Sequence, residues 1–196
     1  MRFWKTTTDF SPVDMMVKYD RFAYGTLEKL DVSVIDLKYE RSDLSMMFFL
    51  PNKKDGLKTL EDGLKKLDLD FIRNQMQEDH VALYLPKFKF EFTQDLDKVL
   101  KHLGMKSAFK PGLADFNVLM DPDVDEPFFL SKIFHKAFIK VDEAGTEAAA
   151  AGFSRLTGGG PPPTYRPFVA DHPFMFMLVL NNLMMFTGVV NNPANF

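Results

Sequence analysis

The sequence predicts an α+β fold that is predominantly antiparallel β, with two or three short helices and one long exposed loop. Strand-like apolar runs recur along the chain, tight-turn residues separate them, and only short stretches place apolar residues at helical spacing. The 196 residues are 46% hydrophobic and 14% aromatic, which is enough for a sizeable core and excludes a disordered chain.

The first part of the chain predicts three antiparallel strands. Residues 13–24 and 27–38 alternate imperfectly between apolar and polar side chains, as strands with one solvated face do. Residues 44–50 form a short apolar run that ends at Pro51-Asn52, a pair typical of turns.

Two short helices and a fourth strand follow. Apolar residues at helical spacing cover residues 57–67, with Asp55 as the expected N-cap, and residues 70–77. Residues 81–92 alternate Phe with charged side chains, which predicts a strand with one face in water.

The middle of the chain predicts a helix, a loop and a long strand. The helix begins at Thr93 and runs to about Leu103, where Gly104 ends it. Residues 109–127 contain Pro-Gly and Asp-Pro pairs and are expected to be loop. Residues 128–141 are the longest strand candidate.

The last part predicts a hairpin. Residues 174–180 and 183–190 are continuous apolar runs, and Asn181-Asn182 between them suits a tight turn. Because these runs do not alternate, we expect both faces of each strand to be covered.

Charge and composition exclude several classes of function. The net charge is −3 with Lys and Arg scattered along the chain, so binding to nucleic acid or to an anionic membrane gains no electrostatic support. The chain has no cysteine, which excludes disulfides and zinc–thiolate sites, and no apolar run reaches the ~18 residues of a membrane span.

No catalytic or metal-binding pattern is present in the sequence. The four histidines lie apart, without the spacing of metal ligands, and are expected to be structural: His80, His102, His135 and His172. Neither a Ser-His-Asp pattern nor a pair of carboxylates can be nominated, so the sequence predicts no enzyme, no cofactor and no metal.

The most informative segment is residues 143–152, Glu-Ala-Gly-Thr-Glu-Ala-Ala-Ala-Ala-Gly, which lies between the long strand and a Gly/Pro-rich stretch. Gly145 can take a positive φ and so allows a sharp turn after the strand. In an extended chain one face carries only small uncharged residues, namely Thr146, Ala148, Ala150 and Gly152. Such a face can enter a sheet as an extra strand. A short helix is the alternative, because Ala is the best helix former.

This segment, together with the later Phe168-Val-Ala-Asp-His-Pro-Phe174, resembles the reactive-loop hinge and the signature after the loop in the serpins, a family of serine protease inhibitors. Leu44-Ser-Met-Met-Phe-Phe-Leu-Pro51 and Leu85-Pro-Lys-Phe-Lys-Phe-Glu91 resemble two further family segments, in the same order. The resemblance runs over residues 13–193 and implies that residues 1–196 are a partial serpin domain with parts of sheets A, B and C.

The resemblance implies a function for the loop, residues 143–167 or thereabouts. In the family a protease attacks the loop and forms an acyl-enzyme, and the cleaved loop then inserts into sheet A as a new strand. By resemblance the hinge is Glu143, Gly145, Thr146, Glu147, Ala148, Ala149, Ala150 and Ala151.

The bond that a protease would cut is less well marked. Counting from both ends of the loop places it, by resemblance, at Gly159-Gly160, where Gly offers a protease pocket no side chain. Arg155-Leu156 is the alternative and suits a trypsin-like enzyme, although it lies out of register. The implied partner is therefore a serine protease, either elastase-like or trypsin-like.

The resemblance assigns structural roles to His135 and to Asp171, His172, Pro173 and Phe174. In the family, the histidine that matches His135 forms a hydrogen bond to an asparagine on another strand. That strand has no counterpart in these 196 residues, so we expect His135 to lack this partner. If His135 is buried, this lack would cost about 1–3 kcal/mol.

The resemblance covers only the C-terminal half of the family fold. The N-terminal helices and the first three strands of sheet A have no counterpart, so strand 128–141 is expected to lack the neighbour against which the loop inserts. We therefore expect the isolated chain to be inactive as a trap and to self-associate through the exposed edge. A non-inhibitory serpin-like binding protein and a truncated fragment without independent activity are the alternatives. The family resemblance favours an extracellular location, and the lack of a signal segment favours the cytoplasm.

Overall fold

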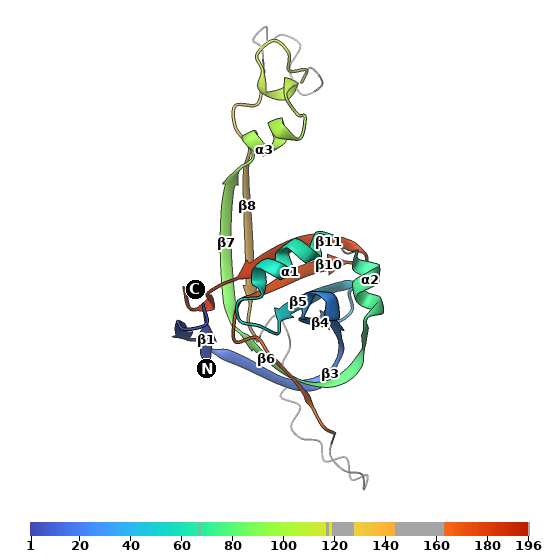
Figure 1. The fold of residues 1–196 in the computed structure, drawn as a ribbon. Coiled ribbons are helices and arrows are strands. Elements are labelled where there is room, and N and C mark those ends of the chain that lie inside the picture. Colours follow the sequence, from blue (N-terminus) through green and yellow to red (C-terminus); the bar gives the residue numbers. More distant parts are fainter. Residues whose placement is uncertain (67, 117, 119–127, 144–162, 196) are drawn as a thin grey trace. The chain divides into compact units, whose positions relative to one another are not determined.

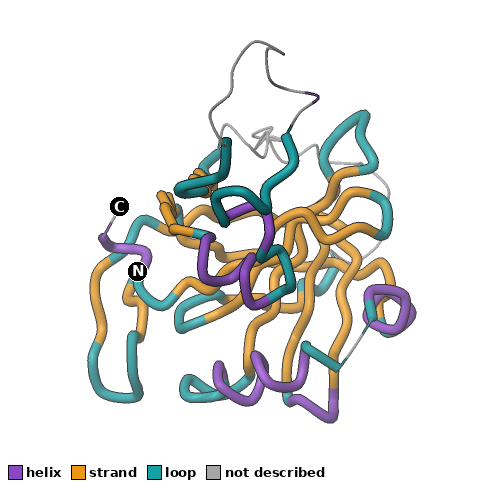
Figure 2. Tube along the Cα trace, turned by 90° about the horizontal axis from the view of Figure 1, so that it is seen from above, coloured by secondary structure: helices purple, strands orange, loops and turns teal. Residues whose placement is uncertain are grey.

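The computed structural model describes residues 1–66, 68–116, 118, 128–143 and 163–195 (Figure 1). The chain divides into two compact units, one made of Met1–Lys89 with Lys140–Phe196 and the other of Phe90–Ile139. Strands dominate the larger unit and its helices are few and short, as the colours in Figure 2 show. The predicted α+β class is confirmed.

The larger unit is built on a seven-stranded sheet with the order β11-β10-β5-β4-β3-β6-β9. Every neighbouring pair is antiparallel except β6 and β9, which are parallel. The strands are β3 (Met15–Leu27), β4 (Val32–Lys38), β5 (Leu44–Pro51), β6 (Met76–Pro86), β9 (Arg166–Val169), β10 (Phe174–Leu180) and β11 (Leu183–Val190).

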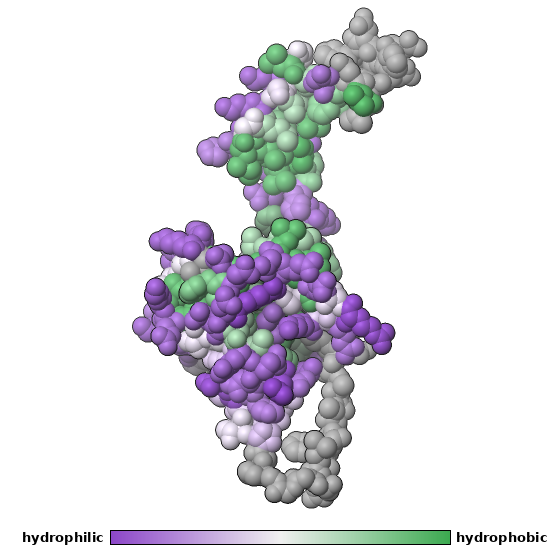
Figure 3. Space-filling model, turned by 90° about the vertical axis from the view of Figure 1, so that its right-hand side faces the viewer, coloured by the Kyte–Doolittle hydropathy of each residue, from purple (hydrophilic) through white to green (hydrophobic). Residues whose placement is uncertain are grey.

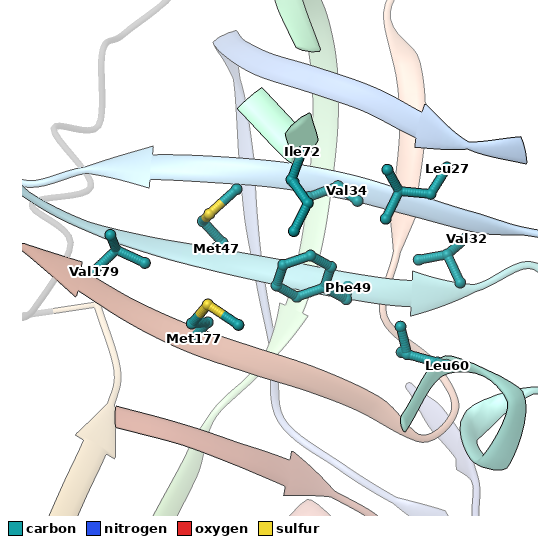
Figure 4. Close-up of a cluster of buried hydrophobic side chains, with 9 residues drawn as sticks. All are labelled: Leu27, Val32, Val34, Met47, Phe49, Leu60, Ile72, Met177 and Val179. Atoms are coloured by element: carbon teal, nitrogen blue, oxygen red, sulfur yellow. The ribbon is translucent and has the colours of Figure 1, made fainter. Parts of the chain in front are cut away.

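A core cluster fills one face of this sheet (Figure 4). Alternate residues of β4, β5 and β10 point into it, and α1 (Leu57–Leu64) and α2 (Leu69–Asn74) each add one buried side chain. Its members are Leu27, Val32, Val34, Met47, Phe49, Leu60, Ile72, Met177 and Val179. The helices therefore cover this face of the sheet.

An aromatic layer packs on the opposite face. Phe174 is fully buried, and its ring centroid lies 6.4 Å from that of Phe3, 6.0 Å from that of Phe48 and 5.9 Å from that of Phe88. All three contacts are edge-to-face, the arrangement that aromatic rings favour. The central strands are thus buried on both faces.

The N-terminal hairpin was not predicted. β1 (Arg2–Trp4) pairs with β2 (Phe10–Pro12), and the pair places Phe3 in the aromatic layer. Three-residue strands have too short a pattern for periodicity to reveal them.

The predicted C-terminal hairpin has the expected strands, β10 and β11, and Asn181 takes a left-handed φ of 53° at the turn. The expectation that both faces of β11 are covered is wrong. Leu183, Met184, Met185 and Phe186 are 64%, 50%, 46% and 43% exposed. The reason is that no described segment packs over these side chains, although the run is as apolar as a buried strand.

The helix boundaries also differ from expectation. Asp55 is not a cap, since Gly56 precedes α1 and no side chain caps that helix. α2 is capped instead by Asp68, whose carboxylate accepts a hydrogen bond from the Phe71 amide at 2.6 Å. It ends at Asn74, three residues early, because β6 begins at Met76.

The predicted strand 81–92 is two strands, β6 and β7 (Phe88–Asp95), separated at Lys87. The Lys87 amide donates to the Asp14 carbonyl at 3.0 Å, which takes it out of both strand ladders. Because β7 continues to Asp95, α3 (Asp97–His102) begins later than the predicted Thr93. Gly104 follows it with a φ of 106°, as expected for the residue that ends a helix.

The smaller unit contains a two-stranded sheet of β7 and β8 (Phe134–Val141). The predicted strand 128–141 is too long, because residues 128–133 bond elsewhere. The Leu130 amide donates to the Ala108 carbonyl at 2.9 Å, and the Ile133 amide donates to the Asp97 carboxylate at 2.7 Å. Of the predicted loop 109–127, residue 117 and residues 119–127 lie outside the described residues.

The smaller unit also carries many exposed apolar side chains. In Figure 3 green patches lie among purple and white atoms over the upper part of the view. Leu103 is 75% exposed, Leu113 63% and Phe134 65%. No described residue covers these side chains.

Candidate functional site: the two ends of the loop

The predicted hinge from Gly145 to Ala151 and both predicted cleavage bonds, Gly159-Gly160 and Arg155-Leu156, lie outside the described residues. The site is therefore built from the two ends of the loop. These are Asp142 and Glu143 after β8, and Tyr165 and Arg166 at the start of β9.

An ion pair holds the first end. The Glu143 carboxylate lies 2.8 Å from the Lys87 ammonium, which stands between β6 and β7. This hydrogen bond raises the pKa of Lys87 and lowers the pKa of Glu143. Val141, two residues earlier, is buried. The buried Val141 and the ion pair of Glu143 together fix the position at which the chain leaves β8.

A second ion pair holds the other end. Arg166 Nε donates to the Asp79 carboxylate at 2.8 Å, and its guanidinium lies 5.1 Å from the centre of the Tyr24 ring. The same hydrogen bond lowers the pKa of Asp79 and raises that of Arg166. β9 then pairs in parallel with β6, with Arg166 opposite Val81.

A cluster of aromatic rings adjoins this end. The Tyr165 ring lies edge-on to Tyr19 at 5.4 Å and to His80 at 5.6 Å. The hydroxyls of Tyr19 and Tyr84 are 2.9 Å apart, and this bond raises the pKa of Tyr84. Sequence reasoning missed this cluster, because it depends on the pairing of β3 with β6.

The segment after β9 is fixed by buried contacts. His172 is 7% exposed, and its Nε2 donates to the Pro51 carbonyl at 2.6 Å while its Nδ1 lies 2.8 Å from the Asp171 carboxylate. The Asp171 carbonyl accepts from the Trp4 amide at 2.7 Å. Phe174 completes the aromatic layer. Residues 171–174 therefore join β5, β10 and the N-terminal hairpin.

His135, unlike the buried His172, lies at the surface. It is exposed on β8, and its ring lies 6.4 Å from that of Phe92 on β7. The expected cost of a buried histidine without its partner does not arise at an exposed position.

Strand β8 has β7 as its one neighbour among the described strands. The other edge of β8 is therefore a place where a further strand can pair.

The described part of the chain contains no group of three His, Asp or Glu side chains that could hold a metal ion. None of its helices is long and apolar enough to cross a membrane.

Comparison with known proteins gives a consistent result. The sequence matches the family described as "Serpin (serine protease inhibitor)" over residues 1–193. It is 36% identical to human Serpin B3 over 98% of this chain and 49% of that protein. It is 35% identical to human plasminogen activator inhibitor 2 over 93% of this chain and 45% of that protein.

Solved structures agree. A cleaved Serpin 42Da superimposes with a TM-score of 0.79 at 34% identity, covering 98% of this chain and 50% of that one. Thyroxine-binding globulin in complex with thyroxine superimposes with a TM-score of 0.78 at 27% identity, with the same coverage. The chain thus spans about half the length of the relatives it matches.

Proposed function

Because the chain belongs to the serpin family, we propose that residues 143–167 form a reactive loop that a serine protease cleaves. One observation carries the proposal. Ion pairs fix both flanks of the segment, Glu143 to Lys87 and Arg166 to Asp79, and the segment between them has the composition of an exposed, extended bait.

The hinge supports the same proposal. Gly145 provides the turn, and Thr146, Ala148 and Ala150 present small side chains on one face of an extended chain. A segment of this kind can add to the edge of a sheet, because no bulky side chain opposes its entry.

The proposed cleavage bond is Gly159-Gly160, which an elastase-like protease with a small pocket accepts. Arg155-Leu156 is the bond for a trypsin-like protease. Pro161, Pro162 and Pro163 stiffen the chain after the first bond. The two bonds predict different target enzymes, so mapping the cut identifies the class of protease.

We further propose that the 196-residue polypeptide by itself is a substrate rather than a trap. A spring-loaded inhibitor needs a strand pairing that is withheld until cleavage. In the described structure β8 pairs with β7 only, so there is no closed pair of strands on its other side for the loop to open. Cleavage would then release no stored energy.

Incubation with an elastase-like and a trypsin-like protease tests the proposal. We expect a first cut inside residues 153–165, located by mass spectrometry, and no protease complex that survives boiling in detergent. A first cut elsewhere contradicts the loop assignment. A detergent-resistant complex contradicts the substrate behaviour and leaves the loop assignment standing.

A carrier function is the second candidate. It rests on the likeness to thyroxine-binding globulin, which was solved as a complex with thyroxine. In that case the loop would be vestigial, and no protease would cut it faster than it cuts other exposed segments of the chain.

A further inference from the structure

The backbone holds the start of β9 only weakly. β9 is a four-residue strand at the edge of the sheet, and its second residue, Pro167, has no backbone N–H to donate. Phe168 is 1% exposed, whereas Arg166 and Pro167 are exposed. Burial therefore fixes the second half of β9. The first half, where the proposed loop ends, depends on the side chain of Arg166.

The Arg166 side chain is held from two other strands of the sheet. Its Nε donates to the Asp79 carboxylate of β6 at 2.8 Å, and its guanidinium lies 5.1 Å from the centre of the Tyr24 ring on β3. Because β6 lies between β9 and β3, the side chain reaches across β6. The hydrogen bond to Asp79 raises the pKa of Arg166 most, and Tyr24 raises it further. Both groups therefore act on the same guanidinium.

A chain of hydrogen bonds fixes the Tyr24 side chain in turn. The Tyr24 hydroxyl donates to Ser33 Oγ at 3.0 Å, and Ser33 Oγ donates to Asn52 Oδ1 at 3.1 Å. Asn52 donates twice to Asp31, from Nδ2 to the carboxylate at 2.7 Å and from its backbone amide to the carbonyl at 2.9 Å. We call Tyr24, Ser33 and Asn52 the polar chain. It joins Arg166 to the turn after β5.

We propose that the polar chain positions the second end of the loop by holding the Tyr24 ring against Arg166. Without this hold, the nearest buried residue of β9 is Phe168, so the fixed end would move from residue 166 to residue 168 and the loop would lengthen by two residues (168 − 166). Tyr24 is thus a positioning residue, because it acts through Arg166. Its effect on cleavage rests on the proposed loop function, whereas its hold on β9 exists in the uncut chain.

Hydrogen exchange of the uncut 196-residue polypeptide tests the hold on β9. Tyr24→Phe keeps the ring and removes the hydroxyl that begins the polar chain. We expect the amides of residues 168–170 to exchange about threefold to tenfold faster in this variant, as the loss of one hydrogen bond allows. The amides of β10 should keep the parent rate, because the opening is local. Unchanged exchange at residues 168–170 would overturn the proposal.

Tyr19→Phe is the matched control. Tyr19 is also a tyrosine of β3, and its ring lies 5.4 Å from that of Tyr165, but its hydroxyl bonds to the Tyr84 hydroxyl and not to the polar chain. This exposed substitution should change the exchange of residues 168–170 less than about twofold. Equal acceleration by the two variants would show that the loss of any hydroxyl near this end loosens β9, and it would contradict the role of the polar chain.

A double variant tests whether the polar chain acts as a unit. Ser33→Ala removes the middle of the chain and should speed exchange at residues 168–170 as Tyr24→Phe does. Because either change breaks the same connection, the double variant should exchange no faster than Tyr24→Phe alone. Effects that multiply in the double variant would show that Ser33 reaches β9 by another route, which would overturn the proposed chain.

The kinetics of the first cut connect the hold on β9 to the loop. A loosened loop takes a conformation that a protease can bind more often, so Tyr24→Phe should lower KM for the cut within residues 153–165 and leave kcat unchanged. Tyr19→Phe should change neither. Faster exchange with an unchanged KM would overturn the positioning role. If the parent is not cut first within residues 153–165, the proposed loop function fails, and the exchange rates still decide whether the polar chain holds β9.

Discussion

The Lys87 ammonium lies 2.8 Å from the Glu143 carboxylate and thereby ties the end of β8 to the junction of β6 and β7. Glu143 is the first residue of the proposed loop and the last described residue before residues 144–162. Its partners are 56 positions apart in sequence (143 − 87), so the contact depends on the tertiary fold and not on local structure.

Replacing Lys87 by Met should loosen the start of the loop. Both partners of the pair are exposed, so we expect little change in thermal stability and a faster first cut by a dilute protease. Lys66→Met, at an exposed lysine of the chain, is the control and should leave the cutting rate unchanged. Equal cutting rates for Lys87→Met and the parent would show that the pair does not restrain the loop.

The Lys87–Glu143 pair should also make the rate of the first proteolytic cut depend on pH. The ion pair with Lys87 lowers the pKa of Glu143 in the folded protein. The stabilisation that this pair gives to the start of the loop is therefore present above the ordinary pKa of 4.5 and is lost as the pH falls through the lowered pKa. In Glu143→Gln the first cut should be faster than in the parent at pH 7, and the difference should vanish in acid. An acid-stable protease with a known cutting rate at both pH values provides the measurement.

Asp36→Asn should stabilise the protein at pH 7. Burial raises the pKa of Asp36 above its ordinary 3.8, more than Ser45, Arg73 and Lys38 lower it, so ionisation of this group opposes folding. The free energy of unfolding that depends on protonated Asp36 is fully present below pH 3.8, and it is lost as the pH rises through the raised pKa of Asp36. Urea unfolding should show a gain of about 1 kcal/mol at pH 7 and none at pH 3. A loss of stability at pH 7 would contradict the raised pKa.

Phe174→Ala should destabilise the larger unit by about 3–5 kcal/mol, because it empties the centre of the aromatic layer. Phe186→Ala, on the neighbouring strand, is the matched control. Phe186 is 43% exposed, so its loss should cost less than about 1 kcal/mol. Similar costs for the two variants would show that the layer does not depend on Phe174.

The exposed edge at β11 should cause self-association. An edge strand with exposed Leu183, Met184, Met185 and Phe186 presents unpaired backbone groups beside an apolar surface. Sedimentation should show association that increases with concentration, and Met185→Lys should reduce it. A monomer at high concentration in both proteins would contradict this prediction.

Much of the fold could be predicted from the sequence, because the strongest patterns are local. The strands of the β10–β11 hairpin match their expected bounds, since two apolar runs around Asn181-Asn182 leave few alternatives. The caps were predicted less well. Asp55, the expected cap of the first helix, does not cap α1, whereas Asp68 caps α2, for which no cap was predicted, because local sequence alone does not decide which Asp lies in capping geometry.

Features that depend on distant segments could not be predicted. The run 183–190 is as apolar as a buried strand, yet its cover is decided by what packs against it and not by its own residues. The Lys87–Glu143 and Arg166–Asp79 pairs likewise join strands from different parts of the chain. One tertiary feature has a local signal in the sequence: Asp36 is the single carboxylate within the apolar run of β4, which is typical of a buried polar group.

The proposed loop itself remains a prediction from residues 143–167. The family is established by the match over residues 1–193, whereas the cleavage bond and the target protease are inferred from composition and position. The compartment also stays a prediction, either extracellular or cytoplasmic.

The central claim is that residues 143–167 form a bait loop whose cleavage releases no stored energy in this polypeptide. Its most direct test is the melting temperature before and after a single cut within residues 153–165, measured on the same preparation. We predict an unchanged or lower melting temperature after the cut, because among the described strands β8 pairs with β7 only, which leaves no closed pair of strands for the loop to enter. A large rise in melting temperature would contradict the account, since it would show that the cleaved loop inserts into a sheet.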